Sequence, residues 1–202
     1  MKKQLEIELS KIIDDFKEPK IKFEQYMTPP EIAAFMIHYA WMRGKIENKK
    51  IIDIGAGTGM LGIGAAFLGG NVTMIEIDKD AYEILKNNVA KTDHEIRLIN
   101  KNIFDFDFDE EYDTALINPP FGIKSKNKDM DFIVKASKIS KHIFSIHDGS
   151  ESNKNNIKSL FEKHNLKIIE SLMMDFSLKS TYPWHEEKNK ILKVMLLHSK
   201  VV

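Results

Sequence analysis

The chain has 202 residues, of which 43% are hydrophobic and 30% are charged, a composition typical of a soluble single-domain protein. It has no cysteine, which excludes disulfides, thiolate metal ligands and a cysteine nucleophile, and no metal site is expected. The 30 basic and 30 acidic side chains balance, so binding to nucleic acid would require segregated basic groups or a second protein. The sequence has no signal-like or membrane-spanning apolar run, and the expected location is the cytoplasm.

Residues 1–45 are predicted to form a helical N-terminal extension with a substrate arm. Apolar residues recur at helical spacing from Met1 to Phe16, and residues 17–26 have the pattern of an extended arm. Thr28, with Glu31 three residues later, matches a capping box and predicts a helix from Thr28 to about Arg43.

Residues 46–202 are predicted to form the catalytic core of the same single domain. Strand and helix patterns alternate from Lys50 onward, which predicts a doubly wound α/β fold with a parallel sheet. The predicted strands cover residues 51–54, 71–75, 95–100, 114–118, 142–147, 166–174 and 190–198. The predicted helices between them cover residues 60–68, 79–90, 130–137 and 150–164, and the last two strands follow each other without a helix.

Three glycines, Gly55, Gly57 and Gly59, alternate directly after the first predicted strand and before a helix. Their spacing differs from the G-x-G-x-x-G pattern of dinucleotide sites, which makes a pyrophosphate ligand less favoured. Glycines let the backbone approach a ligand closely, and Asp53 would partner a cationic group there. An alternative role for Asp53 is to cap the loop.

Two more polar positions follow successive predicted strands, at the edge where open α/β sheets bind ligands. Glu76 lies 76 − 53 = 23 residues beyond Asp53, the spacing at which an acidic residue meets ribose hydroxyls, and Ile77 is predicted to line the same site. Asn102 and Ile103 are predicted to contact the edge and face of an adenine ring. A plain turn is the alternative reading of that segment.

The most informative motif is Asn118-Pro119-Pro120-Phe121, at the end of the fourth predicted strand. Two consecutive prolines stiffen the loop, which would fix the Asn118 amide, the Pro119 carbonyl and the Phe121 ring in one arrangement. The two oxygens would accept both N–H bonds of a planar nitrogen, and the ring would stack on its face. With the glycine loop, this motif predicts methyl transfer from S-adenosylmethionine to an exocyclic amino or amide nitrogen. Lys124 is predicted to contact phosphate, or else to be a solvated loop lysine.

The chain resembles the archaeal and eukaryotic methyltransferases that make N6-methyladenosine in small-subunit ribosomal RNA. The resemblance rests on residues 23–29, the glycine loop and residues 118–124, with Ser145-Ile146-His147 and residues 180–185 as further parts. It implies a class I methyltransferase (Rossmann-like) fold, in which a seven-stranded, mostly parallel sheet carries helices on both faces. It also implies S-adenosylmethionine as cofactor and an arm, with Gln25, Tyr26 and Thr28, that closes over cofactor and target. Asn102 departs from the aspartate that the family often carries.

The resemblance implies partners as well. Ribosomal RNA of the small subunit would be the substrate, with Tyr182, Trp184 and His185 in the target pocket or phosphate path, although lid packing is an alternative for these residues. A small zinc-ribbon activator would pair with the edge strand from Glu95 to Ile99. An ordinary solvated edge strand is the alternative.

Two other functions remain open from the sequence. A protein glutamine side chain presents the same planar NH₂ group as adenine, and Asn-Pro-Pro loops serve its methylation too, usually with tyrosine in place of Phe121. A cofactor-binding scaffold without catalysis is the third reading, and the intact motif disfavours it.

Overall fold

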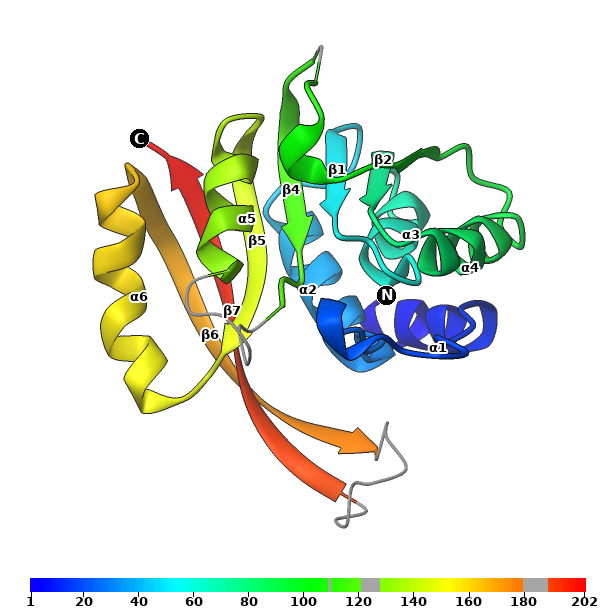
Figure 1. The fold of residues 1–202 in the computed structure, drawn as a ribbon, viewed down its shortest axis with the longest axis horizontal. Helices are drawn as coiled ribbons and strands as arrows, with labels where there is room; N and C mark the ends of the chain where they lie inside the picture. The colour runs from blue at the N-terminus through cyan, green and yellow to red at the C-terminus, as the bar shows by residue number, and fades with distance from the viewer. Residues whose placement is uncertain (109, 121–127, 180–188) are drawn as a thin grey trace.

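The computed structural model describes residues 1–108, 110–120, 128–179 and 189–202 (Figure 1). The described helices are α1 (Lys2–Ile12), α2 (Pro30–Met42), α3 (Met60–Phe67), α4 (Lys79–Val89), α5 (Lys128–Ser137) and α6 (Glu151–Lys163), with short 3₁₀ turns η1 (Ile21–Phe23) and η2 (Ile103–Asp105). The strands are β1 (Lys50–Ile54), β2 (Asn71–Glu76), β3 (Arg97–Asn100), β4 (Tyr112–Ile117), β5 (Ser140–Asp148), β6 (Leu166–Lys179) and β7 (Asn189–Val201).

The strands form one sheet in the order β3-β2-β1-β4-β5-β7-β6. The first five strands of that order are parallel, with Ile52 of β1 opposite Thr73 of β2 and Ala115 of β4. The prediction of a mostly parallel sheet is only partly confirmed, because β7 runs antiparallel to both β5 and β6. Two strands that follow each other without a crossover helix pair as a hairpin, which is antiparallel. The sheet is therefore mixed.

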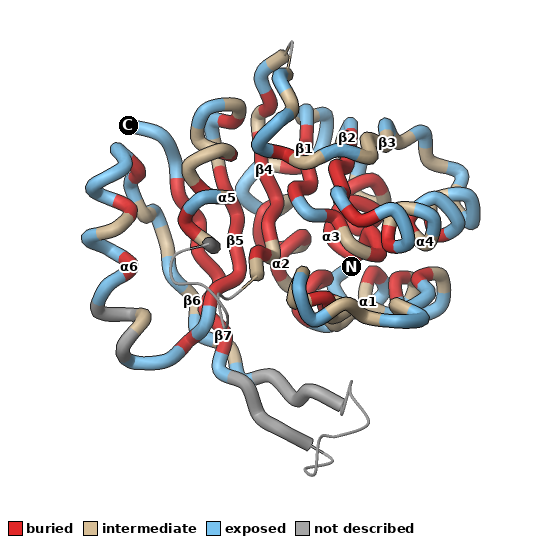
Figure 2. Tube along the Cα trace, viewed as in Figure 1, coloured by how far each residue is buried: buried red, intermediate tan, exposed pale blue. Residues whose placement is uncertain are grey.

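Helices cover both faces of the sheet, as the alternation of strand and helix predicts. One core joins α1, α2 and α3 with alternate strand residues such as Ile51, Met74 and Phe144. The intervening strand residues, such as Ile52 and Ile143, belong to a second core with α5 and α6. Because successive strand side chains point to opposite faces, each central strand supplies both cores and is buried along its length (Figure 2).

The N-terminal helix is shorter than predicted. It ends at Ile12, and the chain continues in extended conformation from Ile13. The Asp14 backbone is held by Asn88 of α4: its N–H donates to Asn88 Oδ1 at 2.9 Å, and its carbonyl accepts from Asn88 Nδ2 at 3.1 Å. These bonds replace helical ones and direct Phe16 toward the glycine loop, where its ring lies 3.1 Å from the position of a Cβ on Gly57.

The capping box at the start of α2 was a wrong prediction. Pro29 is the cap residue and no side chain caps the helix. Thr28 instead accepts a hydrogen bond from Asn118 Nδ2 at 2.8 Å, a partner 90 residues away. By contrast, α4 has a side-chain cap, since Asp78 accepts from the Ala81 N–H at 3.2 Å.

Strand lengths at the two ends of the sheet also differ from prediction. β3 begins at Arg97 rather than residue 95. β6 is longer than predicted because it continues to pair with β7, as far as Lys179 opposite Asn189, after β7 leaves β5 at Val194. β7 is longer mainly at its C-terminal end, where it pairs as far as Val201 opposite Leu166. Beyond β5, residues 175–179 and 189–193 form a two-stranded ribbon that projects from the body of the molecule (Figure 1). Among the described residues, no helix has the length and apolar character needed to cross a membrane.

Gly59 and Gly44 form a matched pair for testing how the glycine loop is built. Both have positive φ, +92° and +66°, but a Cβ on Gly59 would lie 2.5 Å from Leu85 Cδ1, whereas one on Gly44 would meet nothing within 4 Å. Gly44→Ala should cost about 1 kcal/mol of left-handed backbone strain. Gly59→Ala should cost roughly 1–3 kcal/mol more because the core is overpacked. Urea unfolding of the two variants measures the difference, and equal losses would contradict the packing account.

Candidate functional site

A cavity of about 370 Å³ lies where the carboxyl ends of β1, β2 and β4 and the segment after β3 meet, the edge at which open α/β sheets bind ligands. Residues of the N-terminal arm form part of its lining. The predicted cofactor residues in its lining are Gln25, Tyr26, Thr28, Asp53, Gly55, Gly57, Glu76, Ile77, Asn102, Ile103 and Asn118. Residues from five separate segments of the sequence therefore surround one space.

The glycine loop crosses the end of β2 and is tied to it. The N–H groups of Gly55 and Ala56 both donate to the Ile75 carbonyl, at 3.0 and 3.1 Å. Gly57 has φ +56° and carries no side chain between the loop and Phe16. Gly59, also predicted to bind cofactor, is not in the cavity lining; its missing Cβ faces Leu85 and Ile63 in the core. Its role is to turn the chain into α3.

Asp53 is a buried carboxylate at the base of the cavity, only 1% exposed. Its Oδ2 accepts from the Gly62 N–H in α3 at 2.8 Å. Burial raises the pKa of Asp53 to about 7, a rise that the Gly62 bond opposes and the nearby Glu76 carboxylate adds to. A cationic ligand near Asp53 would stabilise its charged form and lower that pKa.

Glu76 holds two loops together with one side chain. Its Oε2 accepts from the Gly57 N–H and its Oε1 from the Asp78 N–H, both at 2.8 Å. Burial raises the pKa of Glu76 above its ordinary value, and these two bonds oppose the rise. The Ile77 N–H also interacts with this carboxylate. A carboxylate has about four acceptor sites, so Glu76 remains able to accept a hydroxyl donor from a ligand.

The arm is anchored on Asp78, the cap of α4. Gln25 Nε2 donates to Asp78 Oδ2 at 3.0 Å, and Lys20 Nζ donates to Asp78 Oδ1 and to Asp80. Gln25 Oε1 in turn accepts from the Lys20 backbone N–H at 2.8 Å. Burial would raise the pKa of Asp78, but its bonds to Lys20, Gln25 and the Ala81 N–H outweigh burial and lower it. The anchor of the arm therefore includes a charged pair, Lys20 with Asp78.

Asn118 is gripped by the same arm. Its Oδ1 accepts from the Tyr26 hydroxyl at 2.9 Å, and its Nδ2 donates to Thr28 Oγ1 at 2.8 Å. Of the two prolines that follow, Pro120 lines the cavity and Pro119 is buried. Phe121 and Lys124, and the predicted substrate residues Tyr182, Trp184 and His185, lie outside the described residues.

The segments after β2 and β3 contribute apolar side chains to the cavity lining. Ile77 and Phe104 are 47% and 45% exposed, which leaves two apolar side chains for a ligand to cover, while Ile103 is buried. Asn102 caps η2, accepting from the Phe104 N–H at 3.2 Å and donating to Asp105 Oδ2 at 2.8 Å. Its side chain thus has the bonds of a turn residue, one of the two readings its sequence allowed.

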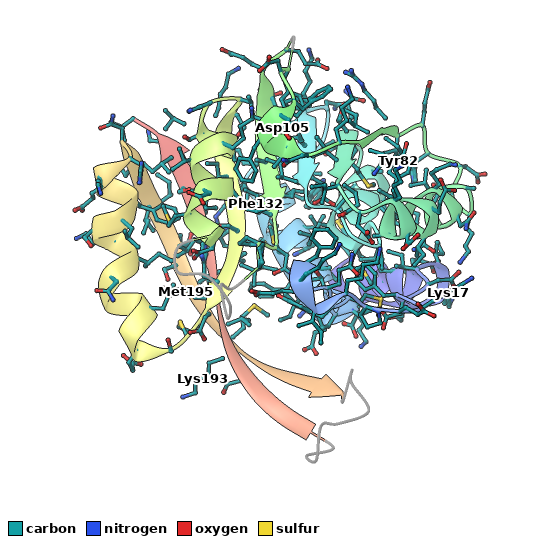
Figure 3. All side chains as sticks on the ribbon, in the orientation of Figure 1. Lys17, Tyr82, Asp105, Phe132, Lys193 and Met195 are labelled. Carbon is teal, nitrogen blue, oxygen red and sulfur yellow. The ribbon has the colours of Figure 1, made fainter. Side chains whose placement is uncertain are left out.

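Several lining residues were not predicted. Among them, Phe132 and Asp131 come from α5, and Phe16 comes from the chain after α1. Phe132, labelled in Figure 3, lies on α5. It packs edge to face on Phe104, with centroids 5.2 Å apart, and its ring lies 3.7 Å from where a Cβ on Gly55 would be. Spacing alone could not identify them, because an aromatic residue in an amphipathic helix has the same pattern as a core residue.

The Ser145-Ile146-His147 motif lies beside the site rather than in it. Ser145 and His147 are buried on β5, with Ser145 Oγ 2.8 Å from His147 Nε2. His147 Nδ1 lies 3.3 Å from Asp129 Oδ2 in the first turn of α5. Neither Ser145 nor His147 lines the cavity. Their contacts with Asp129 instead link β5 to the start of α5, the helix that carries Asp131 and Phe132 to the cavity.

The cavity is lined by chemical groups that match the parts of S-adenosylmethionine. Its volume is in the range of small-molecule sites. It combines buried carboxylates, Asp53 and Glu76, with close backbone approach at the glycines and with exposed apolar side chains. A cationic amino acid, a ribose and a flat ring are the groups that such surfaces accept. The cofactor would be held between the glycine loop, Glu76 and the arm.

The pH dependence of stability tests the burial of Asp53. Because its pKa is higher in the folded than in the unfolded protein, its protonation stabilises the fold at acidic pH, and that contribution is lost as pH rises toward 7. Asp53→Asn keeps an acceptor for Gly62 and does not titrate. Between about pH 4 and pH 7, the free energy of unfolding of the cofactor-free wild type should fall by roughly 1.4 kcal/mol per pH unit relative to the variant. Parallel pH profiles would contradict a raised pKa.

Comparison with known proteins agrees with this geometry. The family model described as methyltransferase small domain matches residues 37–142. The rRNA N6-adenosine-methyltransferase Mettl5 of Drosophila melanogaster is 32% identical over 90% of this chain and 88% of the relative. The METTL5 protein of Danio rerio is 34% identical over 90% of both chains.

A solved structure shares the complete fold. A Pyrococcus horikoshii protein, provisionally described as an RNA methyltransferase, superposes with a TM-score of 0.90 and 31% identity, over 100% of this chain and 96% of that one. The cofactor of this family is S-adenosylmethionine. The chain therefore belongs to the methyltransferase small-domain family and, within it, to the rRNA N6-adenosine methyltransferases represented by METTL5.

Proposed function

We propose that the protein transfers a methyl group from S-adenosylmethionine to the exocyclic N6 of an adenosine in small-subunit ribosomal RNA. The observation that carries the proposal is the position of Asn118, whose amide lies at the end of β4 in the wall of the cavity described above. The relatives named as rRNA N6-adenosine methyltransferases support the substrate class.

When bound, the cofactor supplies an electrophilic methyl group on sulfur, so the protein has mainly to position the reactants. Asp53 and Glu76 place negative charge on the wall of the cavity and favour a cationic ligand. The glycine loop lets the backbone approach that ligand, and the arm covers it. Exclusion of water by the arm strengthens these electrostatic interactions.

The acceptor nitrogen is a weak nucleophile because its lone pair is delocalised into the purine ring. Asn118 Oδ1 and the Pro119 carbonyl would accept hydrogen bonds from its two N–H groups, which draws the nitrogen toward tetrahedral geometry and directs its lone pair at the methyl group. As the N–C bond forms and the S–C bond breaks, one of the two N–H protons would leave to solvent water. The Asn118 oxygen has two lone pairs, and Tyr26 uses one of them, so one remains for the substrate.

The target base must leave its stack to reach Asn118. Phe121 would stack on the flipped base, and Lys124, Tyr182, Trp184 and His185 would contact the target nucleotide or its phosphates. These residues follow Asn118 or connect β6 to β7 in the sequence. A flipped adenine held by stacking and two hydrogen bonds needs no strong general base.

Asn118→Ala tests the reaction and the role of the amide together. Purified protein is given labelled S-adenosylmethionine with small-subunit RNA and, in parallel, a release-factor-like protein. Wild type should label RNA as N6-methyladenosine, and Asn118→Ala should lose about 100-fold or more in rate. The matched control is Asn71→Ala, which should keep full activity. Asn71 is exposed and is the first residue of β2, at the amino ends of the strands and away from the cavity.

The remaining outcomes distinguish the other functions. Label in the protein substrate would make the enzyme a glutamine methyltransferase. Absence of label in both substrates, with a zinc-ribbon activator present, would indicate a cofactor-binding scaffold.

We further propose that β3 binds the zinc-ribbon activator by strand addition. β3 is at one end of the described sheet, so its outer backbone groups have no neighbouring strand. Ile96 and Leu98 would be the apolar contacts with the activator. Both are partly buried against the chain's own core, so backbone bonds would supply most of the affinity. A partner would also help a chain with no net charge to bind RNA.

Hydrogen exchange measures strand addition directly, and the sheet supplies an internal control. On addition of the zinc-ribbon protein, the outward-facing amides of residues 97–100 should exchange at least about tenfold more slowly. Amides of β6, the edge strand at the other end of the sheet, should not change. Protection on β6 alone, or on neither strand, would refute binding at β3.

A further inference from the structure

We infer that Tyr26 and Thr28, both in the arm, are positioning residues that hold the Asn118 amide in the orientation the methyl-acceptor site needs. The inference rests on the proposed function for its catalytic consequence. The family resemblance placed both residues with the cofactor, whereas their hydroxyl groups bond to the asparagine.

The two hydroxyls hold opposite ends of one amide. Tyr26 donates to Oδ1 at 2.9 Å and Thr28 accepts from Nδ2 at 2.8 Å. An asparagine amide rotates broadly about its terminal torsion when it is unrestrained. With both ends bonded, the plane of the amide is fixed relative to the loop, and the loop itself is stiffened by Pro119 and Pro120.

The chemistry of both groups suits this role. Burial raises the pKa of Tyr26 above its ordinary value, so its phenol stays protonated and remains a donor. Thr28 is buried, directly before the prolines that begin α2, and its side chain is free from capping that helix. A rigid helix start therefore holds the acceptor for Nδ2.

The same arm is anchored at the cofactor cavity. Gln25, adjacent to Tyr26, bonds to Asp78, and Asp78 N–H bonds to Glu76 in the cavity wall. One short segment, residues 25–28, thus joins the cofactor-binding wall to the methyl-acceptor loop. An arm that leaves this position would release both ends of the Asn118 amide at once.

Tyr26→Phe and Thr28→Val remove one bond each with little change in shape. Each should lower kcat for RNA methylation about tenfold, the effect of one hydrogen bond, while the Kd for S-adenosylhomocysteine and the melting temperature change little. Thr28→Ser keeps the hydroxyl and should recover most of what Thr28→Val loses. Tyr82→Phe, at a half-buried position of α4 outside the cavity lining, is the matched control for loss of a phenol.

A double-mutant cycle separates positioning from general destabilisation. In the Asn118→Ala background, Tyr26→Phe and Thr28→Val should cause no further loss of turnover, because the group they position is absent. Full additivity would overturn the inference. So would single variants that raise the Kd for S-adenosylhomocysteine about tenfold and leave kcat unchanged, because that result identifies cofactor ligands.

An NMR measurement tests the grip without any activity. The Asn118 side-chain amide signal is identified by its loss in Asn118→Ala, and its protons should exchange with water faster in Thr28→Val than in wild type. If these protons exchanged at the same rate in Thr28→Val and in wild type, Thr28 would not hold the Asn118 amide and the inference would be refuted. Inactive wild type with the predicted exchange would instead refute the proposed reaction and leave the positioning intact.

Discussion

The site depends on one buried carboxylate that ties two loops together. Glu76 accepts from the Gly57 N–H and the Asp78 N–H, and so joins the loop after β1 to the loop after β2. Asp78 then accepts from Gln25 and Lys20 of the arm, and the next residues of the arm hold Asn118. A continuous set of hydrogen bonds therefore runs from the glycine loop through the arm to the acceptor loop.

This set explains how a small protein with few charged anchors builds a defined site. The strands end at a common edge, so their last side chains are near each other without long loops. The carboxylates of Asp53 and Glu76 are bonded to backbone N–H groups rather than to lysines, which leaves their charge available to a cationic cofactor. Apolar side chains of the lining, such as Ile77 and Phe104, would then contact the flat part of the ligand.

The sequence predicts the strand ends better than the contacts between distant segments. Asp53, Glu76 and Asn118 follow or end strongly apolar runs, so the sheet alone brings them together. Thr28 was misread as a helix cap because its true partner is 90 residues away. Phe16 was assigned to a helix because the bonds between Asp14 and Asn88 that end it are invisible to local periodicity.

Two other differences have the same origin. Gly59 shares the spacing of Gly55 and Gly57, yet it faces Leu85 in the core, which only the packing of α4 on α3 reveals. The antiparallel direction of β7 arises because β7, the second strand of the β6–β7 hairpin, lies between β5 and β6, an order that periodicity does not encode. Local pattern thus identifies elements, and their neighbours decide what each side chain does.

A crystal structure with S-adenosylhomocysteine and adenosine would test the account most directly. We expect the ribose hydroxyls of the cofactor product at Glu76 and the adenosine amino group on Asn118 Oδ1, with the bonds from Tyr26 and Thr28 retained. A cofactor product bound outside this cavity, or an adenosine amino group out of reach of Asn118, would contradict it.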